Sequence, residues 1–139
     1  MADKVMRVMS ELHARVLSVT KGRVGGSFRN APVLVLHTTG ARSGKRRDAP
    51  LLYLEDGDSY AVIASAGGAP SHPGWYHNLL ANPDCSVSVA NQTIPVHAEI
   101  LEGEERERAW RGLTALYKSY DAYQEKTDRT IPVMRLRKR

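Results

Sequence analysis

The chain has 139 residues, 42% of them hydrophobic and 25% charged, which fits one globular domain because two half-length domains would each have too small a core. Its 20 Lys and Arg residues exceed its 15 Asp and Glu residues, and the net charge of +5 favours an anionic partner such as a nucleic acid, a membrane surface or an acidic cofactor. The single cysteine excludes an internal disulfide and a thiolate metal site, and no apolar run reaches the roughly 20 residues that span a bilayer.

The first part of the chain predicts a helix, a loop and a hairpin. Apolar residues recur at helical spacing over residues 3–19, with charged residues between them, which predicts an amphipathic helix. The glycine-rich residues 22–26 predict a loop that ends it. Residues 32–38 are rich in β-branched side chains and predict a buried strand. The glycines within 40–44 then predict a turn, with residues 48–54 as the return strand.

The middle of the chain predicts another strand, a loop and a short helix. Asp-Gly-Asp at 56–58 is a strong turn signal, so residues 60–65 are the next antiparallel strand. The Gly- and Pro-rich residues 66–73 predict a loop. Pro73 suits the first turn of a short helix, which ends by Leu80, before Asn-Pro at 82–83.

The last part predicts a hairpin, a second helix and a final strand. Residues 85–89 and 93–100 form the hairpin, and 104–117 has apolar residues on one helical face. A short polar turn with Tyr120 and Tyr123 leads to a strand over 131–136. Five or six strands joined mainly by hairpins predict an α+β fold, an antiparallel barrel with flanking helices, as one domain over residues 1–139 with the helix and loop of 1–28 at its N-terminal end.

Residues 38–47, Thr-Thr-Gly-Ala-Arg-Ser-Gly-Lys-Arg-Arg, could bind an anion. They place four cations within 42–47 on a glycine-punctuated hairpin tip. Glycines let backbone N–H groups approach an anion, and Arg and Lys supply charge and donors. A solvated hairpin whose cations discourage edge pairing explains the same residues equally well. A P-loop is excluded, since its G-x-x-x-x-G-K-[ST] string is absent.

Residues 65–78 form a second candidate segment, in which a strand ends at two glycines and a short helix begins with an aromatic pair. The amides of Gly67 and Gly68 could bond the polar edge of a heterocycle, and Ser65 could reach a substrate oxygen. The structural alternative is a tight turn followed by a helix whose Trp75 belongs to the core.

Three tyrosines at 117, 120 and 123 form a third candidate segment. At this spacing they can line one side of a helical turn, with rings for stacking and hydroxyls for hydrogen bonds or proton delivery. A structural cap over the barrel is the alternative, and spacing alone favours it. The five histidines show no metal-ligand spacing, His37 is expected to be satisfied within the fold, and no G-x-S-x-G string indicates an esterase.

The chain contains several short motifs in this order: Thr-Thr-Gly at 38–40 with Ser-Gly at 43–44, Gly-Gly-Ala at 67–69, Pro-Gly-Trp-Tyr-His-Asn-Leu at 73–79, and Tyr-Asp-Ala-Tyr-Gln at 120–124 followed by Thr-Asp-Arg at 127–129. Together they resemble the deazaflavin-dependent nitroreductase family, a branch of the flavin and deazaflavin oxidoreductases with the split β-barrel fold. The resemblance covers nearly the whole chain. It implies coenzyme F420 as the cofactor, whose phosphodiester and polyglutamate tail need a basic cradle.

The resemblance assigns a role to each segment. The tail cradle comprises Arg42, Ser43, Gly44, Lys45 and Arg47. The deazaflavin ring is expected against Gly67, Gly68, Ala69 and Trp75. The acceptor is expected to face Ser65, Tyr120 and Tyr123 as catalytic groups. Ala41 and Ala66 stand where family members often have basic residues, which puts the affinity for the tail in doubt.

The resemblance therefore implies an F420H2-dependent reductase that transfers a hydride to a quinone, a nitro compound or an activated enone. The alternatives are an FMN-using reductase of the same fold and a non-catalytic barrel that binds a cofactor or a lipid. Nucleic-acid binding is not expected, since no helix-turn-helix, zinc or RNP string is present, and neither is a metal. We expect a cytoplasmic protein, with a homodimer and contact with the inner face of the membrane left open.

Overall fold

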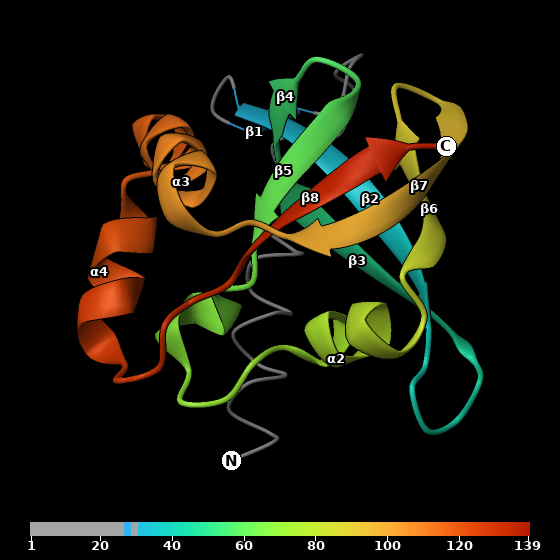
Figure 1. The fold of residues 1–139 in the computed structure, drawn as a ribbon, viewed down its shortest axis with the longest axis horizontal. Coiled ribbons are helices and arrows are strands. Elements are labelled where there is room, and N and C mark those ends of the chain that lie inside the picture. Colours follow the sequence, from blue (N-terminus) through green and yellow to red (C-terminus); the bar gives the residue numbers. More distant parts are fainter. Residues whose placement is uncertain (1–26, 29–30) are drawn as a thin grey trace.

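The computed structural model describes residues 27–28 and 31–139 (Figure 1). The predicted helix over 3–19 and loop over 22–26 lie outside these residues. The strands are β1 (Ser27–Phe28), β2 (Ala31–Thr39), β3 (Arg46–Leu52), β4 (Leu54–Asp56), β5 (Ser59–Ile63), β6 (Asp84–Val89), β7 (Gln92–Ile100) and β8 (Val133–Lys138). The helices are the 3-10 turn η1 (Ala66–Gly68), α2 (Gly74–Ala81), α3 (Gly103–Leu116) and α4 (Ser119–Lys126).

The strands form one sheet in the order β1-β2-β6-β7-β8-β5-β4, with β3 on β2, and every pair is antiparallel. This curled sheet with flanking helices confirms the predicted α+β antiparallel barrel. The described residues contain eight strands rather than five or six. One reason is that the predicted return strand changes partner at Tyr53: β3, which ends at Leu52, pairs with β2, whereas β4, which begins at Leu54, pairs with β5.

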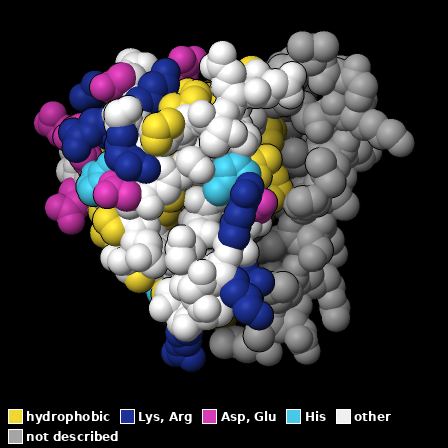
Figure 2. Space-filling model, turned by 90° about the vertical axis from the view of Figure 1, so that its right-hand side faces the viewer, with side chains coloured by type: hydrophobic (Ala, Val, Ile, Leu, Met, Phe, Trp, Pro, Cys, Tyr) yellow, Lys and Arg dark blue, Asp and Glu magenta, His cyan; other side chains and the backbone are white. Residues whose placement is uncertain are grey.

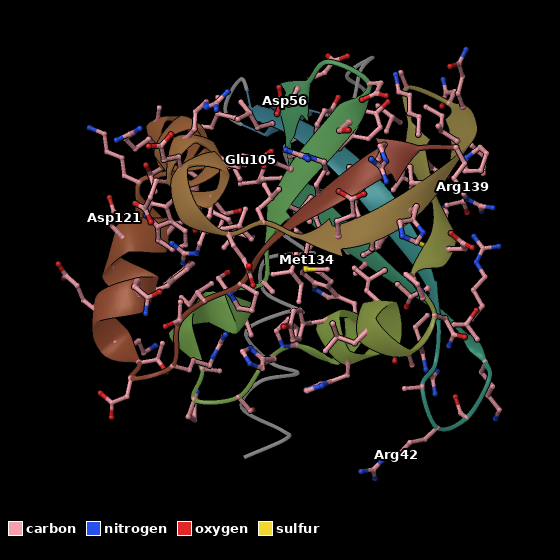
Figure 3. The ribbon with its side chains drawn as sticks, viewed as in Figure 1. Arg42, Asp56, Glu105, Asp121, Met134 and Arg139 are labelled. Carbon is pink, nitrogen blue, oxygen red and sulfur yellow. The ribbon has the colours of Figure 1, made fainter. Side chains whose placement is uncertain are left out.

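Two hydrophobic cores lie on opposite faces of the sheet. Along β5, Tyr60 and Val62 belong to the core inside the curled sheet, while Ala61 and Ile63 belong to the core beneath α3 and α4. Successive side chains of a strand point to opposite faces, so β5 is buried at all five positions. Met134 of β8 lies in the inner core, near the centre of the view in Figure 3. The outer face of β5 therefore needs helices to cover it.

Helices α3 and α4 supply that cover on one flank of the sheet (Figure 1). Trp110 and Leu113 of α3 are buried in the outer core together with Tyr120 of α4. The Trp110 indole N–H donates to Asp121 Oδ1 at 2.9 Å, which ties the two helices together. The prediction of a polar turn around Tyr120 was wrong, because this helix is stabilised by packing against α3 rather than by an apolar repeat of its own.

The β5–α2 loop, residues 64–73, contains η1 and leads to the start of α2. Ala66, Gly67 and Gly68 have φ of 47°, 65° and 81°, so three consecutive residues adopt the left-handed region. A Cβ on Gly68 would lie 2.9 Å from the Tyr123 carbonyl oxygen and 3.0 Å from its Cα. The missing side chain lets α4 dock onto η1, which places the second and third candidate segments side by side.

We expect Gly68→Ala to destabilise the protein more than Gly57→Ala does. Both glycines have positive φ, but a Cβ on Gly57 meets nothing within 4 Å. Left-handed backbone alone costs an alanine about 1–2 kcal/mol, whereas a clash with backbone adds about 1–3 kcal/mol. Thermal and urea unfolding of the two variants measure the difference. Equal losses would show that α4 and η1 move apart at little cost.

Candidate functional site

The basic hairpin, residues 40–47, comprises the turn between β2 and β3 and the first two residues of β3, and it projects beyond the sheet (Figure 1). Gly40 N–H donates to the Lys45 carbonyl at 2.7 Å, and Gly44 N–H donates to the Gly40 carbonyl at 3.0 Å. The Lys45 amide donates to Ser43 Oγ at 3.1 Å. The turn is therefore fixed by its own hydrogen bonds. Because the Gly44 amide is already used, Gly44 serves the turn through its positive φ of 70°.

The cations of the hairpin fall into two groups. Arg46 Nε donates to Asp48 Oδ1 at 2.9 Å, and this bond lowers the pKa of Asp48. Arg42, Lys45 and Arg47 are exposed and form no ion pair with any described residue. Arg42 points away from the sheet at the outer end of the hairpin (Figure 3). The three predicted cradle cations are thus the ones whose charge is left for an anion.

Figure 2 looks onto this side of the molecule, where Lys and Arg side chains gather toward the lower end of the hairpin. His37 on β2 contacts one of these cations, with its Nδ1 2.8 Å from Arg46 Nη2. Its Nδ1 is 2.8 Å from Asp48 Oδ1 and its Nε2 is 2.6 Å from Ser88 Oγ. The expectation that His37 is satisfied within the fold is confirmed. Cys85 on β6 is half-buried, and burial raises the pKa of its thiol to about 11, so it stays protonated near neutral pH.

Asn78 of α2 joins the hairpin to the body of the protein. Its Oδ1 accepts from the Ala41 amide at 2.9 Å, and its Nδ2 donates to Thr38 Oγ1 at 3.0 Å. Thr38 Oγ1 in turn donates to the Arg47 carbonyl at 3.2 Å. Asn78 and Thr38 are both buried, so this chain of bonds holds the exposed cations against a rigid base. The sequence placed Asn78 in a characteristic string without a role, and nothing local reveals that its partner is 37 residues away.

Of the three loop residues predicted to contact the cofactor ring, Gly67, Gly68 and Ala69, two donate their amide N–H groups within the β5–α2 loop. Gly68 N–H donates to the Ser65 carbonyl at 2.9 Å, and Ala69 N–H donates to the Ala66 carbonyl at 3.2 Å. The Gly67 amide donates to no other described residue, which leaves it as a donor for a ligand. Ser65 is buried, and its Oγ likewise has no hydrogen-bond partner in the described part of the chain.

Arg129, between α4 and β8, holds this loop from behind. Its guanidinium donates to the carbonyls of Ala69 at 2.9 Å, Ser65 at 2.7 Å and Ala64 at 3.3 Å. Nη1 also lies 2.8 Å from Nδ1 of His72. The sequence analysis gave Arg129 no role. Its partners lie 57–65 residues away in the chain, so no spacing within the sequence reveals them.

Trp75 at the start of α2 is 6% exposed and belongs to the inner core. Its Nε1 is a buried side-chain nitrogen without a hydrogen-bond partner among the described residues. A buried donor without a partner costs about 1–3 kcal/mol, so this N–H suits a ligand that brings an acceptor. The structural reading of Trp75 as core and the predicted ligand contact are therefore compatible.

The tyrosines form an aromatic cluster between α3 and η1. Tyr120 is 5% exposed, and its ring lies 5.1 Å from that of Tyr117 and 6.2 Å from that of Tyr123, centroid to centroid. The hydroxyls of Tyr117 and Tyr123 are 2.9 Å apart. Burial raises the pKa of Tyr120 far above its ordinary value, and the neighbouring tyrosines act in the same direction. Its hydroxyl therefore stays protonated and can act as a donor.

Among the helices of residues 27–28 and 31–139, none is long and apolar enough to cross a bilayer. No group of three or more His, Cys, Asp or Glu side chains within the described ranges is placed to hold a metal ion.

The family model described as F420H(2)-dependent quinone reductase matches residues 9–138. The chain is 40% identical over 132 residues to an F420H(2)-dependent quinone reductase of Mycobacterium tuberculosis strain H37Rv, covering 92% of this chain and 89% of that relative. It is also similar to the solved structure of an F420-H2 dependent reductase (FDR-A), with a TM-score of 0.70 and 47% identity over 76% of this chain and 93% of that one.

A solved domain-swapped dimer is similar over nearly the whole length, with a TM-score of 0.71, 40% identity, and coverage of 98% of this chain and 99% of that one. The haem storage protein HutZ of Vibrio cholerae, at 16% identity, a TM-score of 0.61 and coverage of 77% of this chain and 81% of that one, is similar in fold alone.

We expect protonation of His72 to destabilise the fold as the pH falls below 6.5. Burial lowers the pKa of His72 from its ordinary value of 6.5, and the charges of Arg129 and His77 lower it further. The folded state therefore binds the proton less readily than the unfolded state. The contribution of neutral His72 to the free energy of unfolding is fully present above pH 6.5 and is lost as the pH falls below that value. Asp48, Asp84 and Glu105 have lowered pKa values and ordinary values of 3.8 to 4.5, so they act only at lower pH.

The measurement is thermal unfolding between pH 7 and pH 5 for the wild type and for His72→Asn. Asparagine keeps an acceptor near the position of Nδ1 but does not titrate. The midpoint temperature of His72→Asn should fall less over this range than that of the wild type. His77→Asn removes the smallest of the three causes, so it should reduce the pH dependence less than His72→Asn does. An unchanged pH dependence in His72→Asn would contradict the expectation.

Proposed function

Because this chain belongs to the F420H(2)-dependent quinone reductase family, in which the predicted resemblance placed it, we propose how its three candidate segments share the work of an F420H2-dependent oxidoreductase. The enzyme uses coenzyme F420 and a quinone acceptor, as its relatives do. When bound, the reduced cofactor supplies the hydride from C5 of its deazaflavin ring. The residues of the chain bind and orient the two reactants and provide a proton donor.

The basic hairpin would hold the anionic tail. Arg42, Lys45 and Arg47 are the exposed cations without a carboxylate partner among the described residues. Arginine binds phosphate and carboxylate oxygens through its fork, and lysine adds a point charge. Asn78 keeps the base of the hairpin fixed, so fewer degrees of freedom are lost on binding. This division of charges is the observation that carries the proposal.

The β5–α2 loop and the start of α2 would hold the headgroup. The Gly67 amide and the Trp75 indole N–H are donors that have no partner among the described residues. The pyrimidine edge of a deazaflavin carries carbonyl acceptors, so donors of this kind fit the group. Gly68 and Ala69, whose amides are used within the turn, would contribute small contact surfaces instead of hydrogen bonds.

The acceptor would lie against the tyrosines of α4. Tyr120 keeps its proton at neutral pH, because burial raises its pKa, and can donate to the oxygen on which negative charge develops. Tyr123 contacts the same cluster and docks against Gly68, and the Ser65 hydroxyl lies on the neighbouring loop. A nitro group and an activated enone develop charge on oxygen in the same way, so we include both with quinones as acceptors.

The assembly is inferred from a similar solved structure, and the location from the acceptor. The similar domain-swapped dimer supports a homodimer. A lipid-soluble quinone favours contact with the inner face of the membrane in a cytoplasmic protein, and the residues expected to make this contact, 3–19, lie outside the described ones.

The decisive experiment is a titration of the protein with oxidised F420 and with FMN, read by tryptophan fluorescence, in the wild type and in Arg47→Ala. We expect F420 to bind, the affinity to fall with salt, and Arg47→Ala to weaken binding about three- to tenfold with a shallower salt dependence. Arg46→Ala, which removes a cation already paired with Asp48, should have a smaller effect. Binding of FMN without binding of F420 would refute the proposal and favour the flavin alternative.

Turnover of F420H2 with menadione and with a nitroimidazole tests the reaction and the proton donor. Tyr120→Phe keeps the buried ring and removes the hydroxyl, so kcat should fall about 10²-fold with an unchanged Kd for F420. Tyr60→Phe, in the inner core, is the matched control and should leave kcat unchanged. A wild-type kcat in Tyr120→Phe would exclude Tyr120 as the donor. Binding without any turnover would favour the non-catalytic alternative.

A further inference from the structure

The β5–α2 loop is held in an unfavourable backbone conformation. Ala66 has φ of 47°, although an L-residue with a Cβ rarely adopts the left-handed region, and Gly67 and Gly68 continue the same hand. Such a turn persists only where surrounding contacts fix it. Ala66 and Gly68 are buried, so solvent does not supply those contacts.

Arg129 supplies three of these contacts. Two of its carbonyl partners, Ala64 and Ser65, precede the strained turn, and the third, Ala69, follows it. One planar guanidinium therefore joins the two ends of the turn. Lys126 of α4 adds a longer contact, 3.5 Å from Nζ to the Gly67 carbonyl. The carbonyl oxygens of the loop are thus drawn toward α4 and the segment after it.

The charge of Arg129 is not neutralised by a nearby acid. It forms no ion pair with any carboxylate of the described residues; its partners are three carbonyls and the imidazole of His72. Burial lowers the pKa of Arg129, which shows that its charge is partly removed from water. By contrast, Arg46 and Arg135 are paired with carboxylates. The loop therefore has a fixed positive charge behind it.

We propose that Arg129 is a positioning residue for the cofactor headgroup: it holds the β5–α2 loop in its left-handed turn, so that the Gly67 amide is already in place when the headgroup binds. This inference rests on the proposed function. Arg129 acts through the loop and needs no contact with the cofactor. A loop that is ordered before binding loses less entropy on binding and keeps the reactants aligned for hydride transfer.

Two variants separate geometry from charge. Arg129→Lys keeps the positive charge but loses the planar fork, and Arg129→Met loses both. The probe is 8-hydroxy-5-deazariboflavin, the cofactor headgroup without phosphate or glutamates, titrated by tryptophan fluorescence. We expect Arg129→Lys to weaken headgroup binding at least tenfold, about 1.4 kcal/mol, and Arg129→Met to weaken it at least as much. The salt dependence of full F420 binding should stay that of the wild type, because the basic hairpin is untouched.

A matched control, Arg106→Lys, and a variant of the basic hairpin, Arg47→Ala, show whether a loss of headgroup affinity is specific to Arg129. Arg106→Lys also removes a half-buried guanidinium that donates to a backbone carbonyl, that of Ile131 at 2.7 Å, and it should leave headgroup binding unchanged. Arg47→Ala should weaken F420 binding without changing headgroup binding. In turnover, Arg129→Lys should lower kcat as well as raise KM for F420H2, whereas Arg47→Ala should mainly raise KM. Headgroup affinity within twofold of the wild type in Arg129→Lys would overturn the inference.

A second pair of variants covers the case in which both Arg129 variants fail to fold. His72→Leu removes one of the four partners of Arg129, and His72→Asn keeps an acceptor there. Headgroup binding should weaken two- to fivefold in His72→Leu and stay closer to the wild type in His72→Asn; equal affinities in both would overturn the inference. If wild-type protein does not bind F420, the proposed function fails and the inference with it. If it binds and turns over while Arg129→Lys is unaffected, only the inference fails.

Discussion

Burial of β5 on both faces is the constraint from which the rest of the structure follows. Side chains of a strand alternate between faces, so a strand that is buried at every position needs a core on each side. The curled sheet provides the inner core, and α3 with α4 provides the outer one. Since Tyr120 must reach the outer core from α4, this helix is drawn against the sheet next to the end of β5. The aromatic cluster therefore lies beside the β5–α2 loop.

Two polar side chains connect the segments that the cores bring near one another. Asn78 fixes the basic hairpin to α2, and Arg129 fixes the β5–α2 loop to the segment after α4. Both bond to backbone atoms, so they set the path of the chain rather than the position of one side chain. The basic residues of these segments fall into two groups, those bonded to the protein and those left exposed. Arg46 and Arg129 are engaged with the protein, whereas Arg42, Lys45 and Arg47 face solvent with their charge available.

The parts that could be predicted from sequence are those whose signals are local. The β2–β3 hairpin, the β6–β7 hairpin and α3 were placed to within a few residues, because turn residues and apolar periods mark them. Helix α4 was misread as a turn, since Ser119–Lys126 has only a weak apolar face and is helical through its contacts with Trp110. Of the two extra strands, β4 was missed because the return strand changes partner at Tyr53, from β2 to β5, and β1 is only two residues long.

The sequence by itself determined the antiparallel α+β architecture, the positive hairpin tip and, through its ordered strings, the family and the cofactor. These depend on residue type and on neighbours close in the chain. Only the tertiary structure decided which cations are free, which loop amides are already used, and that Trp75 is both core and donor. It alone showed that Arg129 closes a left-handed turn. The contacts of Asn78 and Arg129 join residues 37 to 65 positions apart, and no local pattern encodes such pairs.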